Sequence, residues 1–258
     1  MAIETGPKLQ KLLATWPNGS ILTTAGLKRR GYSDALLYHY RNSGWLVAVG
    51  RGAFARAGDV IDWRSGIHAL QNQLKLHVHL GGKAALNYQG AAHFLKLGSE
   101  TVTLFGTAGT RIPSWFASYD WKVRVTLATT NLFPNELGLT SEEAENFALN
   151  ISSRERAMFE TLYLAPKSQS LSEAKLLMAA LTNLRPQLLQ QLLESCSSIK
   201  VKRLFMLFAE ELKLPWVKKL EMDRIDFGSG DRTIVKGGKL HSKYRLTMPV
   251  DLFDEASR

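Results

Sequence analysis

The segment from Ile21 to Gly58 constrains the fold of this chain more than any other part of the sequence. Two short helical patterns are separated there by Gly31 and Tyr32, and two short strand patterns follow them. A helix pair followed directly by a hairpin is the order of a winged helix-turn-helix, a module that places its second helix in the DNA major groove. The segment therefore predicts a DNA-binding module near the start of the chain.

Side chains that cap helices predict where the first helix begins and ends. Thr23 and Thr24 can accept hydrogen bonds from the free N–H groups of a helix over residues 25–30. Gly31 can end this helix, because glycine readily adopts the left-handed conformation found just after helix C-termini.

The second predicted helix, over residues 34–42, has one apolar and one polar face. Ser33 can cap it, and the charge of Asp34 is favourable at the positive N-terminal end of a helix. Spacings of i, i+1 and i+4 place three apolar side chains toward the core: Leu36, Leu37 and Tyr40. The other face carries Tyr38, Arg41 and Asn42.

A strand pair should form the wing. Residues 45–49 and 53–56 have strand character, and the glycine-rich residues 50–52 between them predict a tight turn. We expect Trp45 and Phe54 to lie in the core with the apolar face of the second helix.

Positive charge is concentrated in the same region. Residues 1–60 contain eight Lys or Arg and three acidic residues, so they contribute half of the net charge of +10. Clustered cations bind nucleic acid by displacing counterions, although a basic surface that is merely solvated is the alternative. On the recognition helix, we expect the DNA contacts to come from Ser33, Tyr38 and Arg41. Contacts to phosphate or the minor groove are expected from Lys28, Arg29, Arg30, Arg51 and Arg56.

Composition limits the remaining possibilities. The chain has 258 residues, of which 45% are hydrophobic, so it suits one large domain or two smaller ones. Its single cysteine, Cys196, excludes an intramolecular disulfide and a zinc site made of several thiolates. The sequence shows no secretion signal and no run of about 18 apolar residues, so we expect a cytoplasmic protein without a membrane contact.

The residues after the wing predict an α+β protein with a larger, helix-rich C-terminal domain. We expect a winged helix-turn-helix over residues 1–60 and a second domain over 61–258. The second domain should be mixed α/β to about residue 130, mainly helical to about residue 220, and closed by a small β element. The predicted helices cover 62–74, 83–95, 172–184, 186–195 and 201–214, with further helix starts at Ser141 and Ser153. Predicted strands cover 77–80, 101–105 and 122–127.

Three patterns that resemble catalytic or ligand-binding motifs are better explained by structure. His77, His79 and His93 lack the carboxylate or thiolate that would complete a tight metal site. Gly81-Gly82-Lys83 lacks the spacing and the hydroxyl of a phosphate-binding P-loop. Glu211 and Lys213 lie in a helical pattern, where side chains two residues apart diverge by roughly 200°. We therefore expect no catalytic residues, no cofactor and no metal.

Short motifs in a fixed order give the chain a resemblance to a known family, the AbiEi-type antitoxins of bacterial type IV toxin–antitoxin systems. The resemblance is carried by Gly44-Trp45-Leu46, Gly50-Arg51-Gly52-Ala53-Phe54, Gly81-Gly82-Lys83-Ala84-Ala85-Leu86, Gly90-Ala91-Ala92-His93-Phe94-Leu95 and Thr101-Val102-Thr103-Leu104-Phe105.

This resemblance implies two activities. The winged domain would bind double-stranded operator DNA and repress its own operon, and the C-terminal domain would counteract a nucleotidyltransferase-like toxin. Whether the antitoxin touches the toxin is left open. Two other classes fit a winged module: a transcription factor whose second domain senses a small ligand, and a nucleic-acid-processing enzyme, which would need convergent carboxylates.

Overall fold

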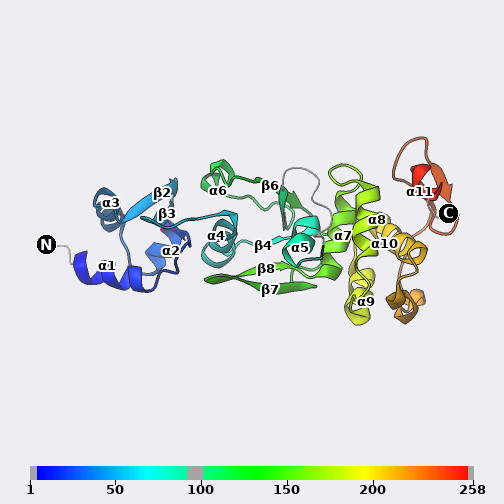
Figure 1. Cartoon of the computed structure of the whole chain (residues 1–258), viewed down its shortest axis with the longest axis horizontal. Coiled ribbons are helices and arrows are strands. Elements are labelled where there is room, and N and C mark those ends of the chain that lie inside the picture. The colour runs from blue at the N-terminus through cyan, green and yellow to red at the C-terminus, as the bar shows by residue number, and fades with distance from the viewer. Residues whose placement is uncertain (1–4, 92–100, 255–258) are drawn as a thin grey trace. The chain divides into compact units, whose positions relative to one another are not determined.

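The structure is a computed structural model that describes residues 5–91 and 101–254 (Figure 1). Its contacts define two compact units, each assembled from separate stretches of the chain. The first contains Met1–Leu80, Ser99–Thr129 and Ser141–Ile151, and the second contains Gly81–Gly98, Thr130–Thr140 and Ser152–Arg258. Helices and several small sheets occur together, which confirms the predicted α+β class.

The first unit begins with the predicted order of a winged helix-turn-helix. Its elements are α1 (Thr5–Ala14), β1 (Leu22–Thr23), α2 (Thr24–Arg29), α3 (Asp34–Asn42), β2 (Leu46–Gly50) and β3 (Ala53–Arg56). The three strands form an antiparallel sheet in the order β1-β3-β2. Its core contains Leu12, Trp16, Leu27, Leu36, Leu37, Tyr40 and Phe54.

The caps expected from the sequence set the limits of both helices. The Thr23 hydroxyl accepts a hydrogen bond from Gly26 N at 3.0 Å, and the Ser33 hydroxyl accepts one from Leu36 N at 3.3 Å. Gly31 follows α2 with a φ of +84°, and Gly44 follows α3 with a φ of +73°. These are left-handed conformations that glycine adopts without steric cost.

A five-stranded sheet follows in the order β6-β5-β4-β8-β7. Its strands are β4 (Val78–Leu80), β5 (Thr101–Gly106), β6 (Arg124–Thr129), β7 (Leu139–Ala144) and β8 (Phe147–Ser152). β4 pairs in parallel with β8 at Leu80 and Ile151, and it pairs antiparallel with β5. The flanking helices are α4 (Trp63–His68), the π-helical turn η1 (Ala69–Gln73) and α6 (Ser114–Ser118).

The helix start predicted at Ser141 is wrong, because this residue lies in strand β7. Ser141-Glu142-Glu143 has the composition of a first helical turn. However, Phe147, Leu149 and Ile151 of β8 alternate with smaller or polar residues, which is strand periodicity. The turn between the two strands contains Glu145 with a φ of +41°. The hairpin therefore overrides the local helix signal.

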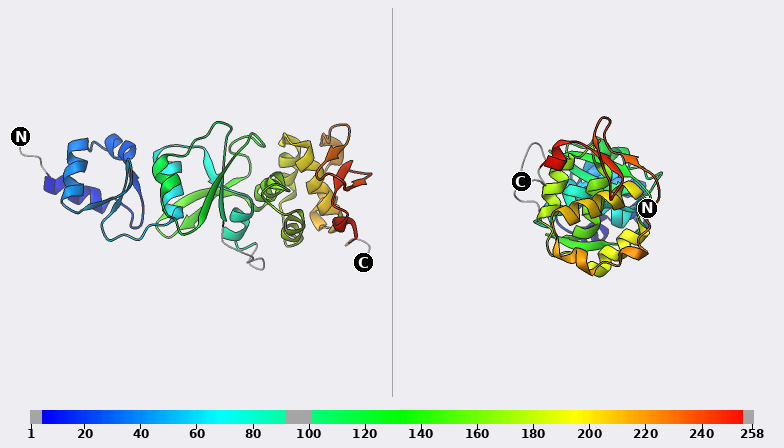
Figure 2. Two further views of the ribbon diagram at one scale, coloured as in Figure 1. Left: turned by 90° about the horizontal axis from the view of Figure 1, so that it is seen from above. Right: turned by 90° about the vertical axis from the view of Figure 1, so that its right-hand side faces the viewer.

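The second unit contains helices that pack side by side and a small sheet (Figure 2). Its helices are α5 (Gly82–Tyr88), α7 (Arg154–Leu164), α8 (Leu171–Ala179), α9 (Pro186–Ser195) and α10 (Ile199–Glu211). Three short helices follow: η2 (Pro215–Lys219), η3 (Met222–Arg224) and α11 (Asp251–Asp254). The closing sheet has the order β10-β11-β9, with β9 at Arg232–Thr233, β10 at Lys239–His241 and β11 at Leu246–Met248.

The boundaries of these elements follow the predictions closely. The helix over 186–195 is confirmed and α10 lies close to its predicted range, whereas α8 ends at Ala179, before the predicted end at residue 184. The helix predicted over 83–95 is shorter: α5 ends at Tyr88, and residues 92–95 lie outside the described part of the chain.

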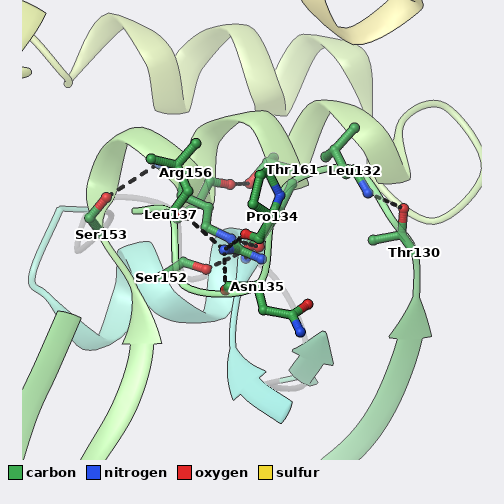
Figure 3. Close-up of polar contacts among 12 residues, drawn as sticks. Thr130, Leu132, Pro134, Asn135, Leu137, Ser152, Ser153, Arg156 and Thr161 are labelled. Atoms are coloured by element: carbon green, nitrogen blue, oxygen red, sulfur yellow. Dashed lines mark hydrogen bonds and ion pairs between the residues drawn. The ribbon is translucent and has the colours of Figure 1, made fainter. Parts of the chain in front are cut away.

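A buried ion pair in α7 organises the second unit. Arg156 donates from Nε to Glu160 Oε1 at 2.8 Å, and its Nη1 donates to the carbonyls of Asn135 at 2.9 Å and Leu137 at 2.8 Å (Figure 3). Glu160 Oε2 accepts hydrogen bonds from Ser152 Oγ at 2.7 Å and from Gly82 N at 3.0 Å. One side-chain pair thus joins α7, the start of α5 and the loop over residues 134–137.

Removing the carboxylate of this pair should destabilise the protein strongly. Glu160→Ala leaves a buried guanidinium without its counter-ion, which typically costs about 3–5 kcal/mol. We expect a loss of this size in the free energy of unfolding measured with urea. Glu136→Ala removes an exposed carboxylate in the same unit and should change it by less than about 0.5 kcal/mol. A cost below about 1 kcal/mol for Glu160→Ala would show that the ion pair does not organise the fold.

Candidate nucleic-acid interface

Helix α3 presents a polar face to solvent. Leu36, Leu37 and Tyr40 are buried, as predicted, whereas the side chain of Tyr38 is 65% exposed. At about 100° per residue, Tyr38 and Asn42 lie at the centre of the exposed face, and Arg41 lies at its margin. The helix therefore offers Tyr38 and Asn42 directly to a partner and Arg41 from one side.

An ion pair joins the end of α2 to the start of α3. Lys28 Nζ lies 2.8 Å from Asp34 Oδ2, and both side chains are more than half exposed. A surface pair of this kind contributes at most about 1 kcal/mol, because water competes for both charges. Lys28 is thus placed beside α3 and can exchange its carboxylate partner for a phosphate at little cost.

The two arginines that end α2 have different surroundings. Arg30 is exposed at the C-terminal cap of the helix. Arg29 is also exposed as a residue, but its guanidinium donates a hydrogen bond to the backbone carbonyl of Gln73 in η1. The direction of the Arg29 side chain is therefore fixed by the fold.

The wing is anchored at its tip. A Cβ atom at Gly50 would lie 2.8 Å from Trp115 Cβ and 3.0 Å from its Cα, so β2 ends in close contact with α6. Arg51, the next residue, is exposed in the turn. The hairpin thus carries an accessible cation on a support that is packed against another helix of the same unit.

The prediction that Trp45 lies in the core is wrong, because this residue is 47% exposed. Trp45 immediately precedes β2 and lies two positions before Val47, so in extended backbone the two side chains share one face. The residue between them, Leu46, points into the core with Phe54, whose predicted burial is confirmed. All three residues over 45–47 are apolar, so the sequence shows no alternation that marks the outward face; only their burial in the structure alternates.

Besides Lys28 and Arg29, two further predicted contact residues have structural partners. The Arg56 guanidinium bonds to Asp59 at 3.1 Å and to Asn18, and its side chain is only 24% exposed. Ser33 caps α3 with its hydroxyl. The other predicted contact residues, which are all exposed, are Lys28, Arg29, Arg30, Tyr38, Arg41 and Arg51; together with exposed Asn42, we call this set the α3 surface.

Family models match almost the whole chain. A model described as the N-terminal domain of the AbiEi antitoxin transcriptional regulators matches residues 5–97. A second model, described as "Transcriptional regulator, AbiEi antitoxin, Type IV TA system", matches residues 99–249. The chain belongs to the AbiEi antitoxin family. This AbiEi antitoxin is accordingly a DNA-binding transcriptional regulator of a type IV toxin–antitoxin system.

A solved structure has the same fold. The crystal structure of the RV2827C protein from Mycobacterium tuberculosis superimposes with a TM-score of 0.60 at 16% sequence identity, covering 97% of this chain and 94% of that chain. No curated protein matches the antitoxin. At this identity the likeness is informative about fold only.

The other motifs considered in the sequence have structural partners in the antitoxin. The Gly82 N–H donates a hydrogen bond to Glu160, and Lys83 forms an ion pair with Glu173. The Gly81-Gly82-Lys83 turn is therefore structural. His79 is buried in β4 with its ring 6.0 Å from that of Phe105, and His93 lies outside the described residues. Within residues 5–91 and 101–254, no helix has the length and hydropathy needed to cross a bilayer.

Charge reversal at the wing tests whether Arg51 contacts DNA. Arg51→Glu should weaken binding to operator and random duplexes alike, because a phosphate contact carries no sequence information. The plot of log K against log salt should lose about one unit of slope. Titrations at several salt concentrations measure both quantities, and circular dichroism checks the fold. Lys236→Glu, at an exposed cation of the second unit, is the matched control. Equal affinities for Arg51→Glu and wild type would mean that Arg51 is only a solvated turn residue.

Proposed function

We propose that this antitoxin represses its own operon by placing α3 in the major groove of operator DNA, and that it counteracts a nucleotidyltransferase-like toxin. The observation that carries the first part is the exposed polar face of α3 beside the cations of α2. A cytoplasmic location, where operator DNA is accessible, belongs to the same proposal.

The dimensions and side chains of α3 support recognition of base edges. Its nine residues span roughly 13 Å, which suits the width of the major groove. Asn42 can form paired hydrogen bonds with adenine, and Arg41 can do so with guanine. The exposed ring of Tyr38 offers an apolar edge to a thymine methyl group.

The cations around α3 support backbone contacts. Lys28 and Arg30 at the end of α2 flank the N-terminal end of α3, where the first helix of a helix-turn-helix crosses the phosphate backbone. Such contacts fix the register of the protein on DNA, while base contacts provide the sequence preference. We therefore assign base reading to α3 and positioning to α2 and the wing.

The toxin part of the proposal rests on membership of the family. Its support in this chain is that the helices and closing sheet of the second unit are separate from the α3 surface in sequence. Direct contact with the toxin is not part of the proposal, because a regulator can also counteract an enzyme through the enzyme's target.

Substitutions at Arg41 and Arg29 should differ in whether the loss of affinity depends on the DNA sequence. Arg41→Ala should cost about 1–3 kcal/mol on the operator and much less on random DNA, because a base contact is lost. Arg29→Ala should weaken both duplexes equally and reduce the salt slope by about 1. Operator and random-duplex titrations at several salt concentrations separate the two cases. Equal losses on both duplexes for Arg41→Ala would contradict base reading by this residue.

Repression and rescue should be separable in the full-length chain. Lys28→Glu combined with Arg41→Glu should abolish repression of the operon promoter, because both reversed charges face the DNA backbone or bases. The same variant should still restore growth when the toxin is expressed from an unrelated promoter. Reporter activity and growth curves measure the two outcomes beside wild type.

The outcomes of this experiment distinguish the alternatives. Loss of rescue in the folded variant would contradict the separation of the two activities. If the wild-type chain rescues no adjacent nucleotidyltransferase-like toxin, a ligand-responsive regulator becomes the better hypothesis.

A further inference from the structure

The side-chain amide of Gln73 is buried where η1 meets the helix-turn-helix. This residue is 7% exposed, its Oε1 accepts a hydrogen bond from Thr23 N at 2.7 Å, and its Nε2 donates to the carbonyl of Ile21. The two partners fix the orientation of the amide, since a backbone N–H requires an acceptor and a carbonyl requires a donor.

Gln73 packs against α2 without any gap. A Cβ atom at Gly26, in the first turn of α2, would lie 2.5 Å from Gln73 Oε1. Thr23, whose N–H is held by Gln73, is also the residue whose hydroxyl caps α2. The N-terminal end of α2 is therefore located by one side chain that lies 50 residues away in the sequence.

The backbone of the same residue holds the other end of α2. The Gln73 carbonyl accepts a hydrogen bond from the Arg29 guanidinium. Gln73 is the last residue of the π-helical turn, and such turns occur frequently at functional sites because they release backbone groups from the regular ladder. An arginine has five N–H donors, so Arg29 keeps donors for a phosphate while one is held by the carbonyl.

We propose that Gln73 is a positioning residue for DNA binding, which holds α2 so that the Arg29 guanidinium is directed at a backbone phosphate before DNA arrives. The proposal rests on the DNA-binding function proposed above. A guanidinium already held in place loses less conformational freedom on binding than a free one, so its contact contributes more to affinity. Gln73 itself touches no DNA and acts through Arg29.

A double-mutant cycle tests this coupling in the full-length chain. Gln73→Met keeps the volume of the side chain but removes its hydrogen bonds to Thr23 and Ile21, so the N-terminal end of α2 is no longer fixed. The Gln73 carbonyl that accepts from Arg29 is unchanged, so any effect on Arg29 is transmitted through α2. In wild type, we expect Arg29→Ala to weaken binding to a random duplex several-fold and to lower the salt slope by about 1. In the Gln73→Met background, the same substitution should have less than half of that fold-effect. Arg51→Ala should have the same fold-effect in both backgrounds, because Arg51 follows the end of β2, which is packed against Trp115, and its side chain is not among the partners of the Gln73 amide.

Gln71→Met is the matched control. Gln71 lies in the same π-helical turn with the same 7% exposure, but its amide bonds to the backbone of Val78 and Asn150 in the sheet. We expect this variant to lose stability without losing DNA affinity at temperatures where it is folded. A role for Gln73 that is only structural would make the two variants equivalent, with multiplicative effects at Arg29, and would overturn the proposal.

A second variant keeps the proposal testable if Gln73→Met does not fold. Arg29→Lys preserves the charge but loses the planar group that can bond to the carbonyl and a phosphate together. It should bind DNA more weakly than wild type while keeping the salt slope, because the charge remains, and binding equal to wild type would overturn the proposal. If Lys28 and Arg41 substitutions weaken binding while Arg29 and Gln73 substitutions do not, only this inference fails. If the wild-type chain binds no duplex, the proposed function itself fails.

Discussion

Two buried glutamine amides, two residues apart in one π-helical turn, make hydrogen bonds on which the first unit depends. Gln71 bonds to the backbones of Val78 and Asn150 and so joins β4 to β8, strands that pair at Leu80 and Ile151. Gln73 bonds to Ile21 and Thr23 and so fixes β1 and the start of α2. Backbone groups buried without such partners would each cost about 1–3 kcal/mol. The sheet and the helix pair α2–α3 thus share one short segment as their common support.

The net charge of +10 is only partly available for binding DNA. In α10, Lys200 donates to the carbonyl of Ala165 at 2.7 Å and Lys202 to that of Asp226 at 3.0 Å. The Arg203 guanidinium donates hydrogen bonds to the carbonyls of Phe227, Gly228 and Gly230, and these bonds connect the segment before the closing β element to α10. These cations satisfy turns that lack regular partners, so their role is structural. Charge counted along the sequence therefore overestimates the nucleic-acid surface, and the count becomes informative only where side chains are exposed, as at Lys28, Arg30 and Arg41.

The sequence predicted the helix-turn-helix well because its signals are local. Thr23 and Ser33 cap their helices by accepting hydrogen bonds from N–H groups three residues ahead. Gly31 and Gly44 adopt the left-handed conformations that their positions require. One feature that was missed, the role of Gln73, depends on a distant partner. The bond between Gln73 and Thr23 spans 50 residues, and nothing in the pattern around Gln73 marks it as buried.

The β7–β8 hairpin and the exposure of Trp45 were missed for a different reason. At Ser141 the composition of a helix start competed with strand alternation, and pairing within a sheet decided the outcome. At Trp45 the size of the apolar ring favoured the core, but the alternation of β2 assigned the inward position to Leu46. For β8 the period of the pattern was more reliable than the composition of the helix start, whereas the uniformly apolar residues 45–49 show no period that could place Trp45.

The anchoring of the wing changes how recognition by this module should be understood. A free wing would have to lose conformational freedom when it meets DNA. Here Gly50 lies against Trp115, where even a methyl group would clash, so the hairpin tip is already ordered. Gln73 holds the start of α2 through Thr23. With the wing and α2 both held, α3 is presented on a rigid support, and in the proposed DNA complex less of the binding free energy would be lost to ordering the protein. The same rigidity makes affinity sensitive to substitutions such as Gln73→Met that touch no DNA.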